Sequence, residues 1–297
     1  MDVHGEKNRE ALKARLTDEQ FRITCDCGTE PPFRNAYWDN HEKGSYLDVI
    51  SGDLLFRSGD KFDSGTGWPS FTRAANPGAV VELEDRSHGM TRIEIRAAKT
   101  GAHLGHVFDD GPPPEGKRYC VNSGALRFVR EEDSVAILAA GCFWGTEAYF
   151  ARVPGVLDTT VGYSGGSGNA SYEEVCSGKT GHAEAVRVVF DPERVSYRDI
   201  LRHFFRMHDP TSVDRQGPDV GTQYRSAIFT IGDRQRKIAE ALARELSDSR
   251  AFREPVATEI SDAGDFFPAE EWHQRYLERN PAGYCHVNLA LARRPLD

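Results

Sequence analysis

The sequence predicts an α+β protein of two domains: a mainly antiparallel β domain over residues 1–132 and an α/β two-layer sandwich domain over residues 133–297. Three observations support this prediction. The length of 297 residues suits one or two domains. The first part contains short runs of alternating apolar and polar residues, separated by Gly, Pro and Asp. After Glu131-Glu132-Asp133, strand-like runs alternate with segments of helical spacing.

In the first domain, we expect one helix near residues 9–16 and a further helical turn at 17–20. Period-two alternation predicts strands at 80–83, 91–96 and 125–129. In the second domain, apolar runs predict strands at 135–140, 183–190, 225–231 and 256–260. Helices are expected at 143–152, after a capping box that starts at Ser196, at 234–246 and at 269–278.

Composition narrows the choice of partners and compartment. The net charge is −9 and no long basic block occurs, which argues against nucleic acid or an anionic membrane surface as a partner. The first 16 residues lack the apolar core of a secretion signal, and no apolar run is long enough to cross a bilayer. The sequence therefore predicts a cytoplasmic protein.

The chain has six cysteines: Cys25, Cys27, Cys120, Cys142, Cys176 and Cys285. A chain of this size can build its core without disulfides, so the cysteines need another explanation. No C-x-x-C pair occurs, which argues against a zinc site with four cysteines. We therefore expect reactive or resolving thiols, no metal and no bound cofactor.

Cys142 follows the apolar run 135–138 and the turn residue Gly141, and it precedes a predicted helix. The unpaired backbone N–H groups at a helix start favour an anion, and the thiolate is the nucleophilic form of cysteine. The alternative is a buried cysteine that acts as a small hydrophobic side chain. Two aromatic residues directly after the thiol, Phe143 and Trp144, favour the reactive thiol.

Glu184 is a candidate general acid. Period-two spacing places it on the same strand face as Val186, Val188 and Phe190. A carboxyl group on a core-facing stripe has a raised pKa and stays protonated near neutral pH. From this pattern alone, a Glu at the strand end that reaches solvent is equally plausible.

In the first domain, Cys120 stands two residues after Arg118, whose charge would stabilise a thiolate, and Asn122 offers an orienting amide. His103 and His106 suggest weak metal ligation, or two unrelated histidines on opposite faces of a strand, and the second reading is favoured on the spacing alone. Trp68 lies in a Gly-rich turn that could expose its indole; core packing is the alternative.

The second domain resembles methionine sulfoxide reductase A over residues 135–289. Four separated motifs carry the resemblance: GCFWG at 141–145, SYEEVCSG at 171–178, TGHAE at 180–184 and DVGTQYRS at 219–226. The resemblance implies Cys142 as nucleophile and Glu184 as acid. It implies three hydrogen-bonding partners of the substrate oxygen, Tyr172, Tyr224 and Asp219. It also implies that Phe143 and Trp144 enclose the substrate methyl group and that Cys285 resolves the oxidised nucleophile.

The first domain is similar to methionine sulfoxide reductase B over residues 17–128. The motifs are TEPPF at 29–33, KFDSG at 61–65, GWPSF at 67–71, HLGHVFDDG at 103–111 and RYCVN at 118–122. The resemblance implies Cys120 as nucleophile, with an acid and hydrogen-bonding pair at His103 and His106. Arg118 and Asn122 would support the nucleophile, and Trp68 would bind the methyl group.

This sequence departs from the B-type pattern in two places. Many relatives hold zinc with two C-x-x-C pairs, and the matching positions here are Asp48, Ser51, Ala97 and Thr100, so we expect no zinc. The usual resolving position before Gly67 is Thr66. Resolution would then come from Cys25, from Cys27 or from an external thiol.

Together the two resemblances imply a bifunctional enzyme that repairs oxidised methionine. A sulfoxide sulfur is a stereocentre, and one enzyme is needed for each epimer. The resemblance assigns the R epimer to the first domain and the S epimer to the second. Its substrate would be methionine sulfoxide in proteins or peptides, with the free amino acid left open, and its reductant thioredoxin or a similar dithiol. A peroxide-reducing thiol enzyme or redox sensor and a non-catalytic sulfoxide-binding module are the alternatives.

Overall fold

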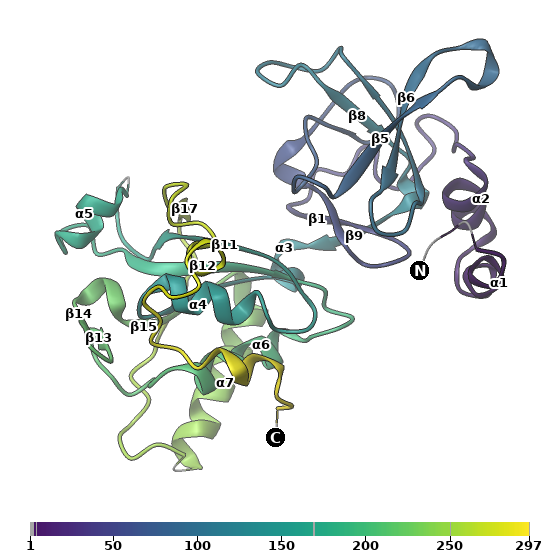
Figure 1. Ribbon diagram of the computed structural model, residues 1–297. Helices are drawn as coiled ribbons and strands as arrows, with labels where there is room; N and C mark the ends of the chain where they lie inside the picture. The colour runs from purple at the N-terminus through teal and green to yellow at the C-terminus, as the bar shows by residue number, and fades with distance from the viewer. Residues whose placement is uncertain (1–2, 4, 169, 250, 297) are drawn as a thin grey trace. The chain divides into compact units, whose positions relative to one another are not determined.

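The structure, a computed structural model, describes residues 3, 5–168, 170–249 and 251–296 (Figure 1). The chain divides into two units, Met1–Glu131 and Glu132–Asp297. Each unit has its own sheets and its own hydrophobic core. Among the described residues, no helix combines the length and the apolar character needed to cross a membrane.

The N-terminal unit begins with two helices, α1 (Glu6–Arg15) and α2 (Asp18–Asp26). At the start of α2, Thr17 and Gln20 form a capping box in which each side chain binds the backbone N–H of the other. The expected single turn at 17–20 is therefore the start of a nine-residue helix. It ends at Cys27, whose backbone is left-handed (φ 52°).

Two antiparallel sheets form the rest of this unit, in agreement with the predicted fold class. The smaller sheet has the order β2 (Leu54–Arg57), β1 (Gly44–Asp48) and β9 (Leu126–Arg130). The larger sheet has the order β3 (Lys61–Phe62), β4 (Ser70–Phe71), β8 (Arg118–Val121), β7 (His103–Phe108), β6 (Arg92–Ala97) and β5 (Val80–Asp85). The core between these elements is rich in aromatic residues and includes Tyr46, Phe56 and Phe71.

The C-terminal unit is built on a mixed six-stranded sheet. Its order is β16 (Glu259–Asp262), β15 (Ser226–Thr230), β10 (Val135–Ala140), β12 (Ala183–Phe190), β11 (Val156–Ser164) and β17 (Phe267–Pro268). Only the β15–β16 pairing is parallel among the strands that the structure describes. A separate hairpin pairs β13 (Arg215–Gln216) with β14 (Asp219–Val220).

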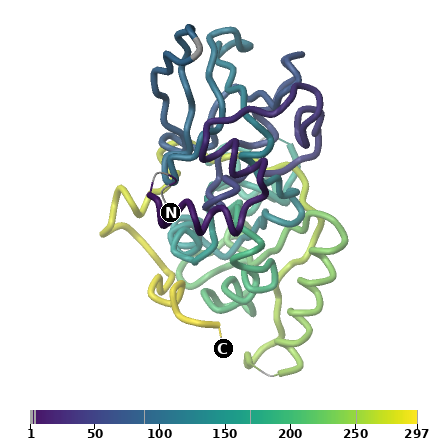
Figure 2. The backbone as a smooth tube through the Cα atoms, turned by 90° about the vertical axis from the view of Figure 1, so that its right-hand side faces the viewer, coloured from purple at the N-terminus to yellow at the C-terminus, as the bar shows by residue number. Residues whose placement is uncertain are grey.

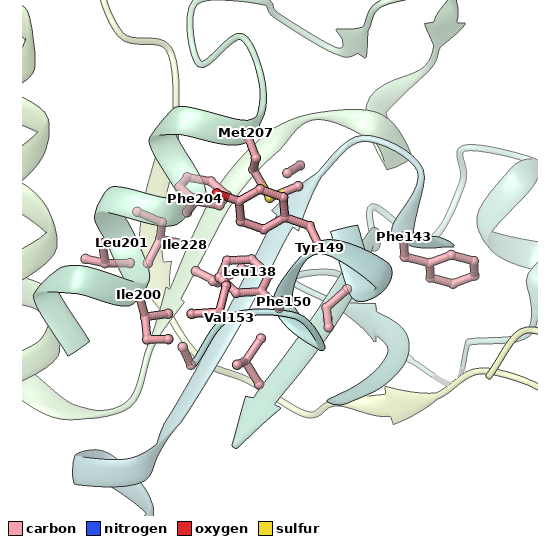
Figure 3. Packing of buried hydrophobic residues seen from close by; sticks show 14 of the residues in the cluster. Leu138, Phe143, Tyr149, Phe150, Val153, Ile200, Leu201, Phe204, Met207 and Ile228 are labelled. Atoms are coloured by element: carbon pink, nitrogen blue, oxygen red, sulfur yellow. The ribbon is translucent and has the colours of Figure 1, made fainter. Parts of the chain in front are cut away.

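Helices cover one face of this sheet and give the predicted two-layer arrangement. The helices that cover it are α4 (Phe143–Phe150), α6 (Tyr197–Met207) and α7 (Gly232–Asp248). Three shorter helices also occur in the described residues: α3 (Glu131–Ser134), α5 (Tyr172–Cys176) and α8 (Tyr276–Arg279). The 17 residues of α7 make the long light-green coil in Figure 2. Figure 3 shows how side chains from α4 and α6 pack against Leu138 of β10 and Ile228 of β15. Short 3₁₀ turns occur at Ser58–Asp60, Ser87–Gly89, Ser123–Ala125, Thr222–Tyr224 and Leu289–Arg293.

The expected helix at 269–278 is wrong for most of its length. Only Tyr276–Arg279 is helical, and the residues before it form turns. Arg275 takes a left-handed backbone (φ 50°), and its N–H donates to the buried carboxylate of Glu147 at 2.8 Å. A contact with α4 therefore overrides the helical spacing of this segment.

Two candidate active sites

Cys142 lies where strand β10 turns into helix α4, as the sequence predicts, and it is the N-cap of that helix. The turn depends on Gly141, which has a φ of 85°. A Cβ atom at this glycine would lie 2.6 Å from the Cβ of Gln216, so the turn leaves no room for a side chain. The strand, the glycine and the helix start together fix the position of the thiol.

The thiol of Cys142 is 8% exposed, and burial raises its pKa well above the usual range. The nearby charge of Glu184 raises the pKa further, whereas the N–H groups of Trp144 and Gly145 lower it. The sequence predicted the contribution of the helix start but not the larger opposing effect of burial. Cys142 is therefore a protonated thiol before a substrate arrives.

Glu184 is buried on β12, and this excludes the alternative of a strand-end glutamate in solvent. Its Oε2 accepts the N–H of Phe143 at 3.0 Å, so the carboxyl group lies directly beside the loop that carries Cys142. Burial raises the pKa of Glu184 to about 8, and the charge of Asp219 adds to this rise. The carboxyl group is therefore mostly protonated at neutral pH.

Tyr172 starts α5, Tyr224 ends the 3₁₀ turn Thr222–Tyr224, and both are within electrostatic reach of Cys142 and Glu184. Burial, followed by neighbouring negative groups, raises the pKa of Tyr172 to about 12 and also raises that of Tyr224. Both hydroxyl groups therefore stay protonated at neutral pH, and that of Tyr172 hydrogen-bonds to the side chain of Cys176. Asp219 lies on β14, where its Oδ2 accepts the hydroxyl of Tyr284 at 2.8 Å.

Phe143 and Trp144 pack against two aromatic side chains that the sequence analysis did not single out, His273 and Tyr276. The indole Nε1 of Trp144 donates to Nδ1 of His273 at 3.0 Å, and the ring of Tyr276 stacks on the indole with 3.8 Å between centroids. His273 is fully buried and also packs on Phe143, with 4.9 Å between ring centroids. The signal was hidden because residues 269–278 read as a surface helix, in which a histidine carries no special meaning.

Cys285 belongs to a C-terminal segment without long helices that contacts the loop of Cys142. Its Sγ donates to the carbonyl of Val287 at 3.3 Å. The next residue, His286, hydrogen-bonds through Nε2 to the carbonyl of Ala140 at 3.0 Å, two residues before Cys142. The structure therefore brings the segment of Cys285 to the start of α4.

In the N-terminal unit, the sheet register lines up polar residues across four strands. Ser70 on β4 is opposite Cys120 on β8, Cys120 is opposite His106 on β7, and His106 is opposite Glu94 on β6. Opposite residues of antiparallel strands point to the same face. This face has a pocket of about 320 Å³, and the lining residues include Cys27, Trp68, His103, His106, Cys120 and Asn122.

The Cys120 thiol is half-buried, and burial raises its pKa. The guanidinium of Arg118 and the hydroxyl of Thr66 hydrogen-bond to the thiol and oppose this rise. Two hydrogen bonds of 2.8 Å to Asp110 hold the guanidinium in place. The position at which many relatives carry the resolving cysteine is therefore in contact with Cys120, but it carries a hydroxyl group.

His103 and His106 both line the pocket, with 5.7 Å between their ring centroids. The spacing of three residues suggested opposite strand faces, and this reading is wrong because the β6–β7 pairing has an irregularity between Ile95 and Arg96. Nδ1 of His103 is 2.6 Å from Oε1 of Glu94, and Nε2 of His106 is 2.8 Å from Asp85. Burial lowers the pKa of His103 even though Glu94 opposes it.

Trp68 and Asn122 are held by the segment that follows α2. The indole Nε1 of Trp68 donates to the carbonyl of Glu30 at 3.1 Å. The side-chain oxygen of Asn122 accepts the hydroxyl of Thr29 at 3.0 Å, and its amide nitrogen donates to the carbonyl of Leu104 at 3.0 Å. Both side chains are thus fixed at the wall of the pocket.

The two N-terminal cysteines differ in position. Cys25 packs against the hydrophobic core, whereas Cys27 is exposed and lines the pocket with Cys120. Sγ of Cys27, a carboxylate oxygen of Glu94 and a ring nitrogen of His103 lie within 4.8 Å of one another, a donor set that zinc accepts. However, Arg96 donates hydrogen bonds to the first two of these groups, so a cationic side chain already lies in the cluster.

The four positions at which B-type relatives hold zinc come together here but do not suit the metal. Oδ2 of Asp48 accepts the hydroxyls of Ser51 at 2.9 Å and Thr100 at 2.8 Å, and Oδ1 accepts the N–H of Ile50 at 3.0 Å. Ala97, the fourth position, offers no ligand atom. A network of oxygen-based hydrogen bonds therefore joins these loops.

Comparison with known proteins identifies both halves of the chain. A family model described as peptide methionine sulfoxide reductase matches residues 134–296, and one described as SelR domain matches residues 16–130. The peptide methionine sulfoxide reductase MsrA of Methanothermobacter thermautotrophicus is 52% identical over 160 residues, which cover 54% of this chain and 95% of the relative. The enzyme of the same name from Pectobacterium atrosepticum is 48% identical over 182 residues, or 59% and 84% of the two chains.

Among solved structures, the reduced form of Mxr1 from Saccharomyces cerevisiae is 38% identical, with a TM-score of 0.49 over 52% of this chain and 88% of that chain. The family models cover the two structural units in turn, and each matched region contains one of the two cysteine sites described above. The chain therefore belongs to the peptide methionine sulfoxide reductase family, as a bifunctional enzyme in which a SelR (methionine sulfoxide reductase B) domain precedes a methionine sulfoxide reductase A domain.

Proposed function

We propose that the N-terminal unit reduces the R epimer of methionine sulfoxide and the C-terminal unit the S epimer. The observation that supports this division is the presence of two different sets of thiol and acid groups on one chain. A chiral pocket that directs a thiol at sulfur and an acid at oxygen favours one epimer, and methionine oxidation yields both. One chain with both sites would repair the whole lesion.

In the C-terminal unit, Cys142 attacks the sulfoxide sulfur while protonated Glu184 donates its proton to the sulfoxide oxygen. Tyr172 and Tyr224 donate hydrogen bonds to that oxygen, with Asp219 as a further polar partner, and Phe143 and Trp144 enclose the methyl group. The oxygen passes to the cysteine sulfur, methionine leaves, and Cys142 becomes a sulfenic acid. Cys285 then forms a disulfide with Cys142 and releases water. The contact of His286 with the carbonyl of Ala140 supports this role, because it holds Cys285 close to the loop.

In the N-terminal unit, the same steps use Cys120 as nucleophile. His103 and His106 supply the acid and hydrogen-bonding groups, while Arg118 and Asn122 support the nucleophile and Trp68 binds the methyl group. We infer that Cys27 rather than Cys25 resolves the sulfenic acid, because Cys27 lines the pocket whereas Cys25 packs against the core. A thioredoxin-like dithiol reduces either disulfide by thiol–disulfide exchange.

Assays with each pure epimer test the division of labour. Cys120→Ser should abolish reduction of the R epimer and keep that of the S epimer, and Cys142→Ser should do the reverse. Product formation is measured by separating methionine from its sulfoxide, with a dithiol as reductant. Loss of both activities in either single variant would show that the sites are not independent.

A further inference from the structure

Strand β6 places a cation and a carboxylate against Cys27. The guanidinium of Arg96 donates through Nη2 to Sγ of Cys27 at 3.2 Å and to Oε1 of Glu94 at 3.0 Å. The same oxygen of Glu94 lies 3.9 Å from Sγ of Cys27. Nη1 of Arg96 donates to the carbonyl of Gly101 at 3.2 Å, which fixes the guanidinium. The side chain of Arg96 is only 17% exposed, so solvent screens its charge weakly.

The backbone of Cys27 also marks this position. Cys27 is the C-cap of α2 with a φ of 52°, a left-handed conformation that glycine normally occupies at helix ends. A side chain in this conformation is uncommon, and such positions cluster at functional sites. The next residue is Gly28, yet the left-handed position at the helix end is occupied by Cys27 and not by this glycine.

We propose that Arg96 and Glu94 activate Cys27 for its attack on the sulfenic acid of Cys120, with Arg96 stabilising the thiolate and Glu94 accepting its proton. This inference rests on the proposed role of Cys27 as resolving cysteine. In the step, a bond forms between the two sulfurs and the bond from the Cys120 sulfur to oxygen breaks. The proton of Cys27 passes through Glu94 and its partner His103 to the departing oxygen, which leaves as water. The Cys120 sulfur is reduced and the Cys27 sulfur is oxidised, so no further oxidant is needed.

The electrostatics of the resting state agree with this division of roles. Burial raises the pKa of Cys27, the charge of Arg96 lowers it, and the charge of Glu94 raises it. Although burial raises the pKa of Glu94, hydrogen bonds from Arg96 and His103 bring it below its usual value. Glu94 is therefore ionised and can receive a proton. The two neighbours of the thiol should consequently shift its titration in opposite directions.

Two substitutions test this. The rate of alkylation of Cys27 is measured against pH by mass spectrometry of its peptide. In Arg96→Gln, the pH at which this rate rises should be higher than in the unchanged protein. In Glu94→Gln, this pH should be lower. In a single turnover with the R epimer, Arg96→Gln should slow formation of the Cys27–Cys120 disulfide at least about tenfold relative to methionine release at neutral pH. The sulfenic acid should accumulate and be trapped by dimedone, and Arg96→Lys, which keeps the charge, should restore part of the rate.

Arg86→Gln is the matched control, because Arg86 is exposed, lies between β5 and β6 and pairs with Glu84 instead. The inference is wrong if Arg96→Gln behaves like this control, or if both test substitutions shift the titration of Cys27 in the same direction. Cys27→Ser tests the underlying assignment separately. If Cys120 still forms a disulfide in Cys27→Ser, the resolving role itself is contradicted. If that disulfide is lost in Cys27→Ser but forms at the normal rate in Arg96→Gln, only the activation by Arg96 is contradicted.

Discussion

At the scale of single residues, burial controls the protonation of the groups in both candidate active sites. In the C-terminal unit, burial keeps both the thiol of Cys142 and the carboxyl of Glu184 in their neutral forms at neutral pH. For the proposed mechanism this means that a neutral Glu184 does not repel the thiolate of Cys142 and carries a proton for the substrate oxygen. In the proposed mechanism, the same desolvation prepares Glu184 as the acid and keeps the Cys142 thiol protonated until the substrate is bound.

We expect Glu184→Gln to reduce turnover of the S epimer about 100-fold or more, because the amide cannot supply a proton, while turnover of the R epimer stays unchanged. In the unchanged enzyme, S-epimer turnover should fall as the pH rises through about 8, where Glu184 loses its proton. Glu147→Gln is the control: Glu147 is a buried carboxyl group on α4 with a pKa raised to about 7, and its amide can still accept the N–H of Arg275. Equal losses in both variants would argue against a specific acid role for Glu184.

His273 provides a second prediction at this scale. His273→Phe keeps an aromatic ring beside Phe143 but removes the acceptor of the Trp144 indole, and leaving this part-buried donor unpaired costs up to about 3 kcal/mol. The indole is then less firmly placed, so KM for the S epimer should rise roughly tenfold, more than kcat falls. Steady-state kinetics with the pure epimer measure both quantities. An unchanged KM with a folded variant would mean that Tyr276 alone positions the indole.

At the scale of elements, α2 connects local sequence to the pocket, because its capping box lies at one end and Cys27 at the other. Strands and helices with strong periodicity could be predicted: the expected strands 135–140 and 183–190 have the observed bounds of β10 and β12. Two features were beyond sequence reasoning. The turns before α8 depend on a contact with Glu147 in α4, and the shared face of His103 and His106 depends on an irregular strand pairing.

The residues that surround Cys27 show the same limit. Arg92, Glu94 and Arg96 alternate with apolar residues on β6, which predicted a strand with a polar face. The sequence could not show that the neighbouring strand in space carries His106, and that the next carries Cys120. Arg92 on this polar face lines the pocket, and Glu94 on the same face contacts the ring of His103. The register between these neighbouring strands supplies this information, and periodicity within one strand does not.

The capping box of α2 gives a prediction at this scale. Thr17→Ala removes the acceptor for the N–H of Gln20 and should lower the stability of the N-terminal unit by about 1 kcal/mol. Denaturant unfolding of the unit, followed by circular dichroism, measures the change. Since Cys27 terminates the same helix, disulfide formation with Cys120 should also slow. A Thr17→Ser variant keeps the hydroxyl and should behave as the unchanged protein; a matching loss in that variant would exclude capping as the cause.

The hydrogen-bond network of Asp48 gives a second prediction at this scale. Asp48→Ala leaves the hydroxyl of the buried Thr100 without its acceptor and should destabilise the N-terminal unit by about 2 kcal/mol. Treatment with a chelator should change neither the unfolding transition nor R-epimer turnover, because the residues at these positions do not suit zinc. A fall in stability on chelation would contradict this account of the network.

At the scale of the whole molecule, each unit contains all the strands of its sheets and all the residues of its candidate site. We therefore expect residues 1–131 and 132–297 to fold as separate chains. The first should reduce only the R epimer and the second only the S epimer, each at a rate close to that of the joined protein. Circular dichroism and the epimer assays test this. An inactive but folded half would show that its site needs the other half.

The hydrogen-bond network of Asp48, Ser51 and Thr100 has a consequence for the conditions under which this enzyme works. Oxidants that convert methionine to its sulfoxide also attack cysteine thiolates, including those that bind zinc. A scaffold joined by carboxylate and hydroxyl oxygens offers such oxidants no sulfur to modify at this point. At this point of the N-terminal unit, the groups that join the loops are therefore ones that such oxidants do not convert.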